Sequence, residues 1–425
     1  MASIVRFGKK IRNNWKKTTF AALVVTYGYN WTKEYLQTQE LMRVYCQKAS
    51  NFGRQTLPVD RAPKTITVIL NPNANKRSAV DEFEKYCAPI LHLAGFMVNI
   101  LKTESEGHAK KLVEDLNNTD AIVVAGGDGT LCEVVTGLLR RTEENTVGLV
   151  PIGILPLGRN NALATSLFPG GNSLKRVRSL VDAAMAIVEE TTKPIDVMKV
   201  EITEKDDIEK ESKPTYAVSS LKWGAFRDAE VSKDKYWYYG SLRKYATYVF
   251  NGYKSNLTWK VDADLKYSPP CEGCLNCLAK KNNNNNQKWF QRFSKEKSFD
   301  NKLAKTLNPN CGVENLKKIE TTDFVLYTSN TVSNEENIPK LHLNIGPKFL
   351  NYFDFVKQGW KSENGHAREA KEKIDARVVE INPGVHSSNE KEVWFSIDNE
   401  AFEVRPIKIT LLPKLITMFC EKERT

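Results

Sequence analysis

The chain has 425 residues, of which 41% are hydrophobic and 10% aromatic, so it can form two domains and is not disordered throughout. Its formal net charge is +11, and six of these positive charges lie in residues 1–17, which contain no acid. A basic arm favours a membrane or targeting role over nucleic acid, and eight cysteines in so long a chain argue against a secreted disulfide scaffold.

The first predicted element is an arm formed by residues 1–60. An apolar run of about 14 residues follows the basic start and ends in aromatic side chains. A membrane-spanning helix needs about 20 apolar residues, so this run is short. Because the first acid is Glu34, the arm is typical of a mitochondrial signal. We predict an uncleaved mitochondrial anchor or a segment that lies on the membrane. The alternative is an amphipathic helix packed on the next domain.

Strand and helix patterns alternate in residues 61–195, where we predict an α/β nucleotide-binding domain with a doubly wound parallel sheet. The predicted strands are residues 65–70, 97–101, 121–125 and 153–155. The predicted helices are residues 80–94, 107–116, 131–139 and 174–189.

Short β-rich runs replace this alternation in residues 196–425, where we predict a mainly antiparallel β-sandwich that binds the lipid substrate. The runs are residues 197–202, 216–221, 256–261, 323–327, 340–345, 376–381, 392–397 and 406–412. Two insertions interrupt them: a charged loop at 204–213 and a poorly ordered, asparagine-rich stretch near 268–320.

Residues 126–130 read Gly-Gly-Asp-Gly-Thr and follow the predicted strand 121–125. Glycines let the backbone approach a phosphate, and the N-terminus of the next helix offers free N–H groups. Asp128 beside phosphates implies Mg²⁺ between them. A glycine pair alone is more often a tight turn. Since the chain has neither a Walker A motif nor the protein-kinase motifs, the turn indicates another class of phosphotransferase.

Five motifs in order make residues 63–413 similar to the diacylglycerol kinase catalytic family, which includes the sphingosine and ceramide kinases. They are Asn71-Pro72 with the loop 73–76, the turn 126–130, and the segments 156–161, 223–228 and 397–400. The basic arm and the segments 88–93, 236–238 and 411–413 resemble the mitochondrial branch of acylglycerol kinases. Three residues depart from the usual family pattern: Arg159, Ala162 and Asn399.

This resemblance implies a kinase that uses ATP and Mg²⁺ to convert mono- and diacylglycerol into lysophosphatidic and phosphatidic acid, with ceramide and sphingoid lipids as further candidates. It implies a place at the mitochondrial inner membrane, facing the intermembrane space, and a kinase-independent role in the carrier translocase there. We expect membrane lipids and translocase subunits as partners, and no nucleic acid. The alternatives are a non-catalytic translocase subunit and a soluble kinase related to NAD kinases, which share the 126–130 turn.

The resemblance also implies the roles of individual residues. Asp128 would hold the metal or act as the base, Asp398 would join the metal network, and Glu400 is the favoured base. Asp398 and Glu400 are two apart on a predicted strand and would point to one face. Asp228 and Glu230 would approach the lipid head group or the metal. The nucleotide would contact Asn71, Pro72, Lys76, Gly126, Gly127, Gly129, Thr130, Gly158 and Asn161.

Without the resemblance, each of these acids has an ordinary interpretation. Asp398 and Glu400 would form a solvated edge strand, and Asp228 and Glu230 a surface ion pair. The spacing of Cys271, Cys274 and Cys277 resembles part of an iron–sulfur run, but a fourth cysteine is missing, so a loop feature or a disulfide is favoured.

Overall fold

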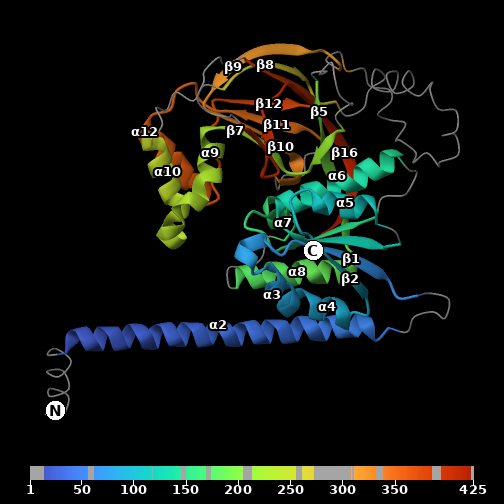
Figure 1. The fold of residues 1–425 in the computed structure, drawn as a ribbon, viewed down its shortest axis with the longest axis vertical. Coiled ribbons are helices and arrows are strands. Elements are labelled where there is room, and N and C mark those ends of the chain that lie inside the picture. The colour runs from blue at the N-terminus through green and yellow to red at the C-terminus, as the bar shows by residue number, and fades with distance from the viewer. Residues whose placement is uncertain are drawn as a thin grey trace.

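The computed structural model contains an α/β unit and a β-sandwich unit that share one continuous ten-stranded sheet (Figure 1). The fold class predicted from the sequence is therefore confirmed. The structure describes residues 14–55, 62–116, 118–144, 150–168, 174–203, 213–254, 261–271, 308, 311–331, 338–384 and 394–422.

Four parallel strands form the α/β unit, in the order β2-β1-β3-β4. Their central members are apolar along almost their whole length, because helices cover both faces of the sheet. All four strands were predicted within one or two residues of their ends. They are β1 Thr65–Leu70, β2 Met97–Lys102, β3 Ala121–Gly126 and β4 Ile152–Pro156.

Helices pack on both faces of this sheet, with α3, α4 and α8 on one side and α5 and α6 on the other (Figure 1). The predicted helix 80–94 is α3 and α4 joined by one π-helical turn, Phe83–Cys87, and the short α7 was not predicted. The helices are α3 Ala79–Glu82, α4 Ala88–Leu93, α5 His108–Glu114, α6 Asp128–Glu144, α7 Ala162–Leu167 and α8 Lys175–Glu189.

The second unit packs a six-stranded antiparallel sheet against the antiparallel half of the ten-stranded sheet, and one apolar core fills the space between them. The six-stranded sheet contains β7 Ser220–Gly224, β10 Asp323–Thr328, β11 Leu341–Ile345, β12 Glu372–Ala376, β14 Trp394–Ile397 and β15 Glu400–Glu403. The opposite layer contains β5 Thr192–Ile202, β6 Thr215–Ala217, β8 Val261–Ser268, β9 Asn315–Thr321, β13 Val378–Pro383 and β16 Ile407–Phe419.

Some of the predicted sandwich strands need correction. The run 216–221 is split into β6 and β7, and the run 376–381 into β12 and β13. β9 lies inside the stretch 268–320 that was predicted to be poorly ordered. Of the run 256–261, only residue 261 is described, and it begins β8. The predicted loop 204–213 lies almost wholly outside the described residues.

Strand β16 connects the two units. It runs antiparallel to β5, and its register shifts between Leu412 and Ile416. Beyond this shift, Ile416 and Met418 are buried in the core of the α/β unit, and Met418 pairs with Ile152 of β4. The last described strand of the chain therefore belongs to both units. The predicted boundary at 195/196 falls within β5, and that division stays a prediction.

A helical lobe projects from the six-stranded sheet, and the sequence analysis did not predict it. It consists of α9 Ala225–Val231, the 3-10 segment Ser232–Leu242, α10 Arg243–Lys254 and α12 Tyr352–Glu363. Its small core includes Phe226, Tyr248 and Phe355. The sequence analysis assigned no element to these residues. Aromatic residues favour strands, and packing between the helices decided the outcome.

The N-terminal arm contains one long helix, α2 Trp15–Gly53. Its C-terminal part packs on α4 and α8, with Ala49 buried and the Tyr45 hydroxyl donating to Asp182. The N-terminal part projects from the body and exposes Phe20, Val25 and other large apolar residues (Figure 1). None of the described helices combines the length and apolarity of a membrane crossing. Membrane attachment of the arm stays a prediction.

Candidate active site

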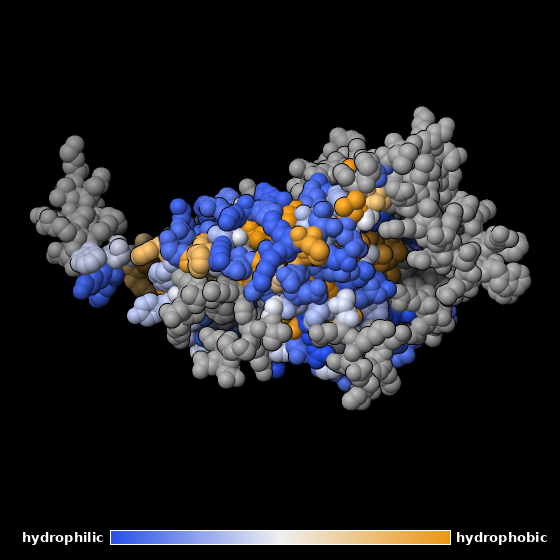
Figure 2. Space-filling view, turned by 90° about the horizontal axis from the view of Figure 1, so that it is seen from above, coloured by the Kyte–Doolittle hydropathy of each residue, from blue (hydrophilic) through white to orange (hydrophobic). Residues whose placement is uncertain are grey.

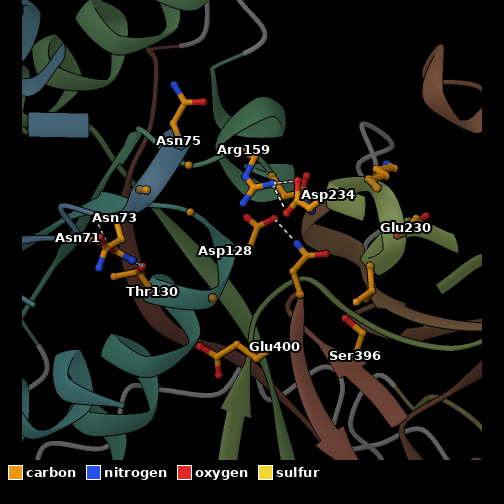
Figure 3. A pocket seen from close by; sticks show the side chains of 18 of the residues that line it. Asn71, Asn73, Asn75, Asp128, Thr130, Arg159, Glu230, Asp234, Ser396 and Glu400 are labelled. Carbon is orange, nitrogen blue, oxygen red and sulfur yellow. Dashed lines mark hydrogen bonds and ion pairs between the residues drawn. The ribbon is translucent and has the colours of Figure 1, made fainter. Parts of the chain in front are cut away.

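A cavity of about 940 Å³ lies between the α/β unit, the β-sandwich and the helical lobe (Figure 3). The loops after β1, β3 and β4 contribute Asn71, Gly127 and Gly158 to its wall. Parallel α/β sheets bind ligands at this carboxyl edge of their strands. The sandwich contributes Asn399 and Glu400 from the turn after β14 and the start of β15. Motifs that are far apart in the sequence therefore meet at one cavity.

The turn after β3 and the turn after β4 are in direct contact. Gly158 N donates to Gly126 O at 2.9 Å, and Asp128 N donates to Asn160 O at 3.1 Å. A Cβ at residue 158 would lie 2.3 Å from Gly127 Cα. Glycine is therefore required at Gly158 so that the two backbones can meet. The sequence analysis had assigned Gly127 and Gly158 only to contact with phosphate.

Asp128 is the first residue of α6, so the predicted turn already includes the start of this helix. Its buried carboxylate accepts through Oδ2 from Ala162 N and from Asn399 Nδ2, both at 3.0 Å. Oδ1 is buried and has no hydrogen-bond partner among the described residues. Burial raises the pKa of Asp128, and the Ala162 N–H and the Lys222 charge oppose this effect. An unpartnered carboxylate oxygen beside a polar cavity suits a divalent cation.

The loop after β1 supports the same wall. Asn71 Nδ2 donates to Thr130 Oγ1 at 3.1 Å, and Asn71 Oδ1 accepts from Asn73 N at 3.0 Å (Figure 3). Asn71 and Thr130 line the cavity, whereas Pro72 does not. The side chain of Lys76 lies outside the described part of the chain.

Asn161 holds its own loop together. Its Nδ2 donates to Gly158 O at 2.8 Å, and its buried Oδ1 has no partner among the described residues. Gly158, Arg159 and Asn160 line the cavity, but Asn161 does not.

The last motif forms a tight turn between β14 and β15. Asp398 and Asn399 have φ values of +46° and +69°, as in a two-residue type I′ hairpin turn. Asp398 is fully buried and accepts from Val218 N, Ser219 N and Ser220 N at 2.7, 2.9 and 2.8 Å. Burial raises its pKa to about 7, although these N–H donors oppose the shift. The structure does not bring Asp398 to the cavity wall. Asp398 is the first residue of the turn and Glu400 the first residue of β15, so the two do not share one face of a strand.

Glu400 faces the cavity and lies against the start of α6. Its Cγ is 3.1 Å from the place where residue 129 would carry a Cβ, so Gly129 leaves room for this side chain. Burial raises the pKa of Glu400 to about 8, and the neighbouring Glu133 and Glu106 add to the shift. Glu133 is held in place because its two oxygens accept from Gly107 N and Ala109 N.

Basic side chains also line the cavity. Arg159 forms an ion pair with both oxygens of Asp234, and Arg243 contacts Asp234 at 3.4 Å (Figure 3). Arg176 donates to Glu82 at 2.6 and 2.9 Å. Arg159, one of the departures from the family pattern, therefore connects the turn after β4 to the helical lobe.

The two acids predicted to meet the lipid head group differ in position. Glu230 lines the cavity, and its carboxylate accepts from Lys222 Nζ at 2.8 Å and from Arg368 Nη1 at 3.1 Å. These cations hold the pKa of Glu230 at about 2 despite its burial. Asp228 forms an ion pair with Arg227 at 3.0 Å and is not part of the wall.

Three structural contributors escaped the sequence analysis. Asn399 was noted only as a departure from glycine, yet it bonds Asp128. Glu133 lies four residues after Gly129 on α6, so helical spacing could have revealed it. The Asn160 carbonyl carried no sequence signal. Among the described residues, no three metal-ligating side chains form a cluster, and of the three clustered cysteines only Cys271 is described.

Glycine turns at the carboxyl edge of a parallel sheet, a buried carboxylate with one oxygen unpartnered among the described residues and a second unit beside the cavity are the features of a two-unit phosphotransferase. The family model of the diacylglycerol kinase catalytic domain matches residues 65–200, and that of the acylglycerol kinase C-terminal region matches residues 218–425. The chain is 37% identical to "Acylglycerol kinase, mitochondrial" of Homo sapiens, over 98% of this chain and 97% of that protein. The corresponding protein of Xenopus laevis is 31% identical, over 100% of this chain and 97% of that protein.

Similarity extends to other kinases over part of the chain. Human sphingosine kinase 1 is 30% identical over 43% of this chain and 46% of that protein. A solved putative diacylglycerol kinase from Bacillus anthracis aligns with a TM-score of 0.49 and 16% identity, over 84% of this chain and 97% of the other. The chain belongs to the acylglycerol kinase family, and it is a lipid kinase whose phosphoryl donor is ATP.

Proposed function

We propose that this lipid kinase phosphorylates the hydroxyl group of mono- and diacylglycerol in the cavity described above, giving lysophosphatidic and phosphatidic acid. Ceramide and sphingoid lipids are further candidate substrates, since they also carry a hydroxyl group. The observation that carries the proposal is the unpartnered, buried Asp128 Oδ1 in a cavity that also contains Glu400. The similarity to the acylglycerol kinases supports the same substrates.

The phosphates of ATP would bind at the N-terminus of α6. Gly129 and Thr130 belong to its first turn, where backbone N–H groups and the helix dipole favour an anion. Gly126 and Gly127 bring this turn to the one that contains Gly158, and Asn71 fixes the Thr130 hydroxyl. Pro72, Lys76 and Asn161 belong to the proposed nucleotide site on the family resemblance alone, since neither Pro72 nor Asn161 lines the cavity.

Asp128 would hold Mg²⁺, since its free oxygen supplies one ligand and the cavity leaves room for phosphate oxygens and water to supply the others. When bound, Mg²⁺ would neutralise charge on the ATP phosphates. We now assign Asp398 a supporting role, because three backbone N–H groups already occupy its oxygens. It fixes the turn that carries Asn399 and Glu400.

Glu400 would act as the general base. Its carboxylate would accept the proton of the lipid hydroxyl, while the hydroxyl oxygen forms a bond to the γ-phosphorus and ADP leaves. A carboxyl group whose pKa is raised to about 8 is well matched to this step near neutral pH. Glu230 would lie near the head group as part of the ion network that holds the lobe, whereas Asp228 lies outside the wall.

A lipid panel tests the proposed substrate class. The purified full chain is incubated with γ-labelled ATP, Mg²⁺ and monoacylglycerol, diacylglycerol, ceramide or sphingosine, and the labelled lipids are separated. We expect label in the two acylglycerols. Label only in ceramide or sphingosine would contradict the substrate assignment, and no labelled lipid would favour a non-catalytic role.

We further propose that the protein is mitochondrial, lies at the inner membrane facing the intermembrane space, and contributes to the carrier translocase there independently of catalysis. The similarity to mitochondrial acylglycerol kinases supports the mitochondrial location, and the projecting, apolar part of α2 supports membrane attachment. Carrier import into mitochondria that contain only the Asp128→Asn variant tests the second role. Carrier import should continue in this variant. If import were lost together with kinase activity, the two roles would not be independent.

A further inference from the structure

The 3-10 segment Ser232–Leu242 of the helical lobe has two chemically different sides. Gly240 and Ser241 line the catalytic cavity. Trp237 and Leu242 do not line it and are exposed by 72% and 61%. One short segment thus connects the polar cavity with an apolar surface.

The neighbouring helices of the lobe form a second apolar surface. A groove of about 580 Å³ between α10 and α12 is lined by Tyr352, Phe353, Trp360 and other apolar residues. Phe353 is 79% exposed. Soluble proteins rarely leave so many large apolar side chains on one small lobe without a partner for them.

The charges on the lobe suit an anionic surface. Lys235 and Lys357 are exposed, and neither has an acidic partner within the described parts of the chain. The acid Asp234 is paired with Arg159 and Arg243. Interleaved aromatic and basic side chains are typical of proteins that lie in the head-group region of a bilayer.

The position of the lobe agrees with a lipid partner. In Figure 1 it lies on the left of the molecule, the side toward which the N-terminal half of α2 projects. Figure 2 shows hydrophobic residues at that end, beside hydrophilic ones. An enzyme that phosphorylates acylglycerols must take its substrate from a bilayer, so this inference rests on the proposed function.

We propose that the helical lobe is a membrane-docking surface for anionic phospholipid bilayers. Trp237, Leu242 and Phe353 enter the boundary between head groups and acyl chains, and Lys235 and Lys357 contact the acidic head groups. The acylglycerol then enters the cavity beside Gly240 and Ser241. This surface acts in addition to α2.

Vesicle binding by the full chain tests the proposal. Flotation with phosphatidylcholine vesicles, with and without phosphatidylserine, is measured for W237S/L242S/F353S and for K235Q/K357Q. The matched controls are L316S and K318Q, two exposed residues of β9. We expect the serine variant to bind both kinds of vesicle about tenfold more weakly. Phosphatidylserine should increase the vesicle affinity of the lysine variant about tenfold less than it increases that of wild type. The controls should bind like wild type.

A kinetic comparison separates docking from catalysis. Phosphorylation of diacylglycerol in anionic vesicles should fall in both lobe variants, whereas phosphorylation of the same lipid in detergent micelles should not change. Because α2 is present in every variant, the differences report the lobe alone.

Four results decide the proposal. Unchanged vesicle binding would overturn it, and so would an equal loss of activity in vesicles and micelles. Unchanged vesicle binding with lost association to a membrane protein complex would overturn it in favour of a protein-binding surface. Weaker vesicle binding by the variants, with no lipid phosphorylation by wild type in either form, would support docking and contradict the proposed function.

Discussion

The hydrogen bond from Asn399 Nδ2 to Asp128 Oδ2 joins the sandwich to the α/β unit at the proposed metal ligand. It leaves Oδ1 as the oxygen without a partner. Asn399 also tolerates a φ of +69°, where most residues are strained. One asparagine therefore supplies both the turn geometry and the orientation of the carboxylate.

We predict that Asn399→Gly lowers kcat about tenfold and the free energy of unfolding by about 1.5 kcal/mol. Glycine keeps the positive φ but loses the hydrogen bond to a charged group, which is worth about this much. Asn399→Ala should lose the same activity and about 1 kcal/mol more of stability, because alanine is strained at this φ. Steady-state kinetics and thermal unfolding of both variants check this. Full activity in the glycine variant would show that the bond does not orient Asp128.

The pH dependence of the rate should report Glu400. Its pKa is raised to about 8, so the carboxylate form that can accept a proton predominates only above that pH. We predict that kcat rises with pH and levels off above about pH 8. Glu133→Gln removes a negative neighbour, which lowers the pKa of Glu400 and should move the rising limb down by about one pH unit. Glu104→Gln changes an exposed acid outside the cavity and should leave the pH–rate profile unchanged. If Glu133→Gln did not shift the profile either, Glu400 would be excluded as the general base.

At the scale of elements, an ion network attaches the helical lobe to the six-stranded sheet. Glu230 on α9 accepts from Lys222 on β7 and from Arg368, and Arg368 also donates to Asp323 on β10 at 2.9 and 3.3 Å. The Arg368 guanidinium lies 4.8 Å from the centre of the Phe226 ring. The network thus fixes the wall of the cavity that the lobe provides.

We predict that Glu230→Gln lowers the free energy of unfolding by about 3 kcal/mol, because two partly buried cations, Lys222 and Arg368, lose the anion that they share. The pKa of Glu230 is depressed to about 2, so its contribution to stability is present above about pH 4.5 and is lost as the pH falls toward 2. The difference between variant and wild type should therefore shrink in acid. Denaturant unfolding at several pH values measures it. Glu369→Gln, which removes an exposed partner of Lys361, should cost less than about 0.5 kcal/mol.

At the scale of the whole molecule, β16 makes the two units dependent on each other. Its last residues are buried in the α/β core, while its first residues belong to the sandwich core. We predict that Met418→Ala costs about 3 kcal/mol and lowers the single thermal transition of both units together. Thr417→Ala, an exposed neighbour on the same strand, should have little effect. Two separate transitions in Met418→Ala would contradict this coupling.

How much the sequence could reveal differs between the two units. The parallel strands were predictable because buried runs such as Ala121–Gly126 are apolar and bounded by turns. The helical lobe was not, because Tyr245, Tyr248 and Phe250 favour strands until neighbouring helices cover them. The long strand β16 could not be foreseen either, since its second half is defined by pairing with β4 and β5 across the chain.

The candidate site, like the fold, was predictable only in part. The turn of residues 126–130 indicated a phosphate and a metal by itself. That Glu400 would lie beside it, more than 250 residues later, came only from the family resemblance, and the bond from Asn399 to Asp128 was not predicted. The direction of Asp398 depends on the positive φ values of its turn, which spacing alone cannot give.

Phosphoryl transfer by two site variants tests the central claim most directly. Label from γ-labelled ATP is followed into monoacylglycerol and diacylglycerol for wild type, Asp128→Asn and Glu400→Gln, with thermal unfolding as the control for folding. We predict that both variants fold and that each loses at least about a hundredfold in kcat. Wild-type rates in either folded variant would contradict the role assigned to that carboxylate.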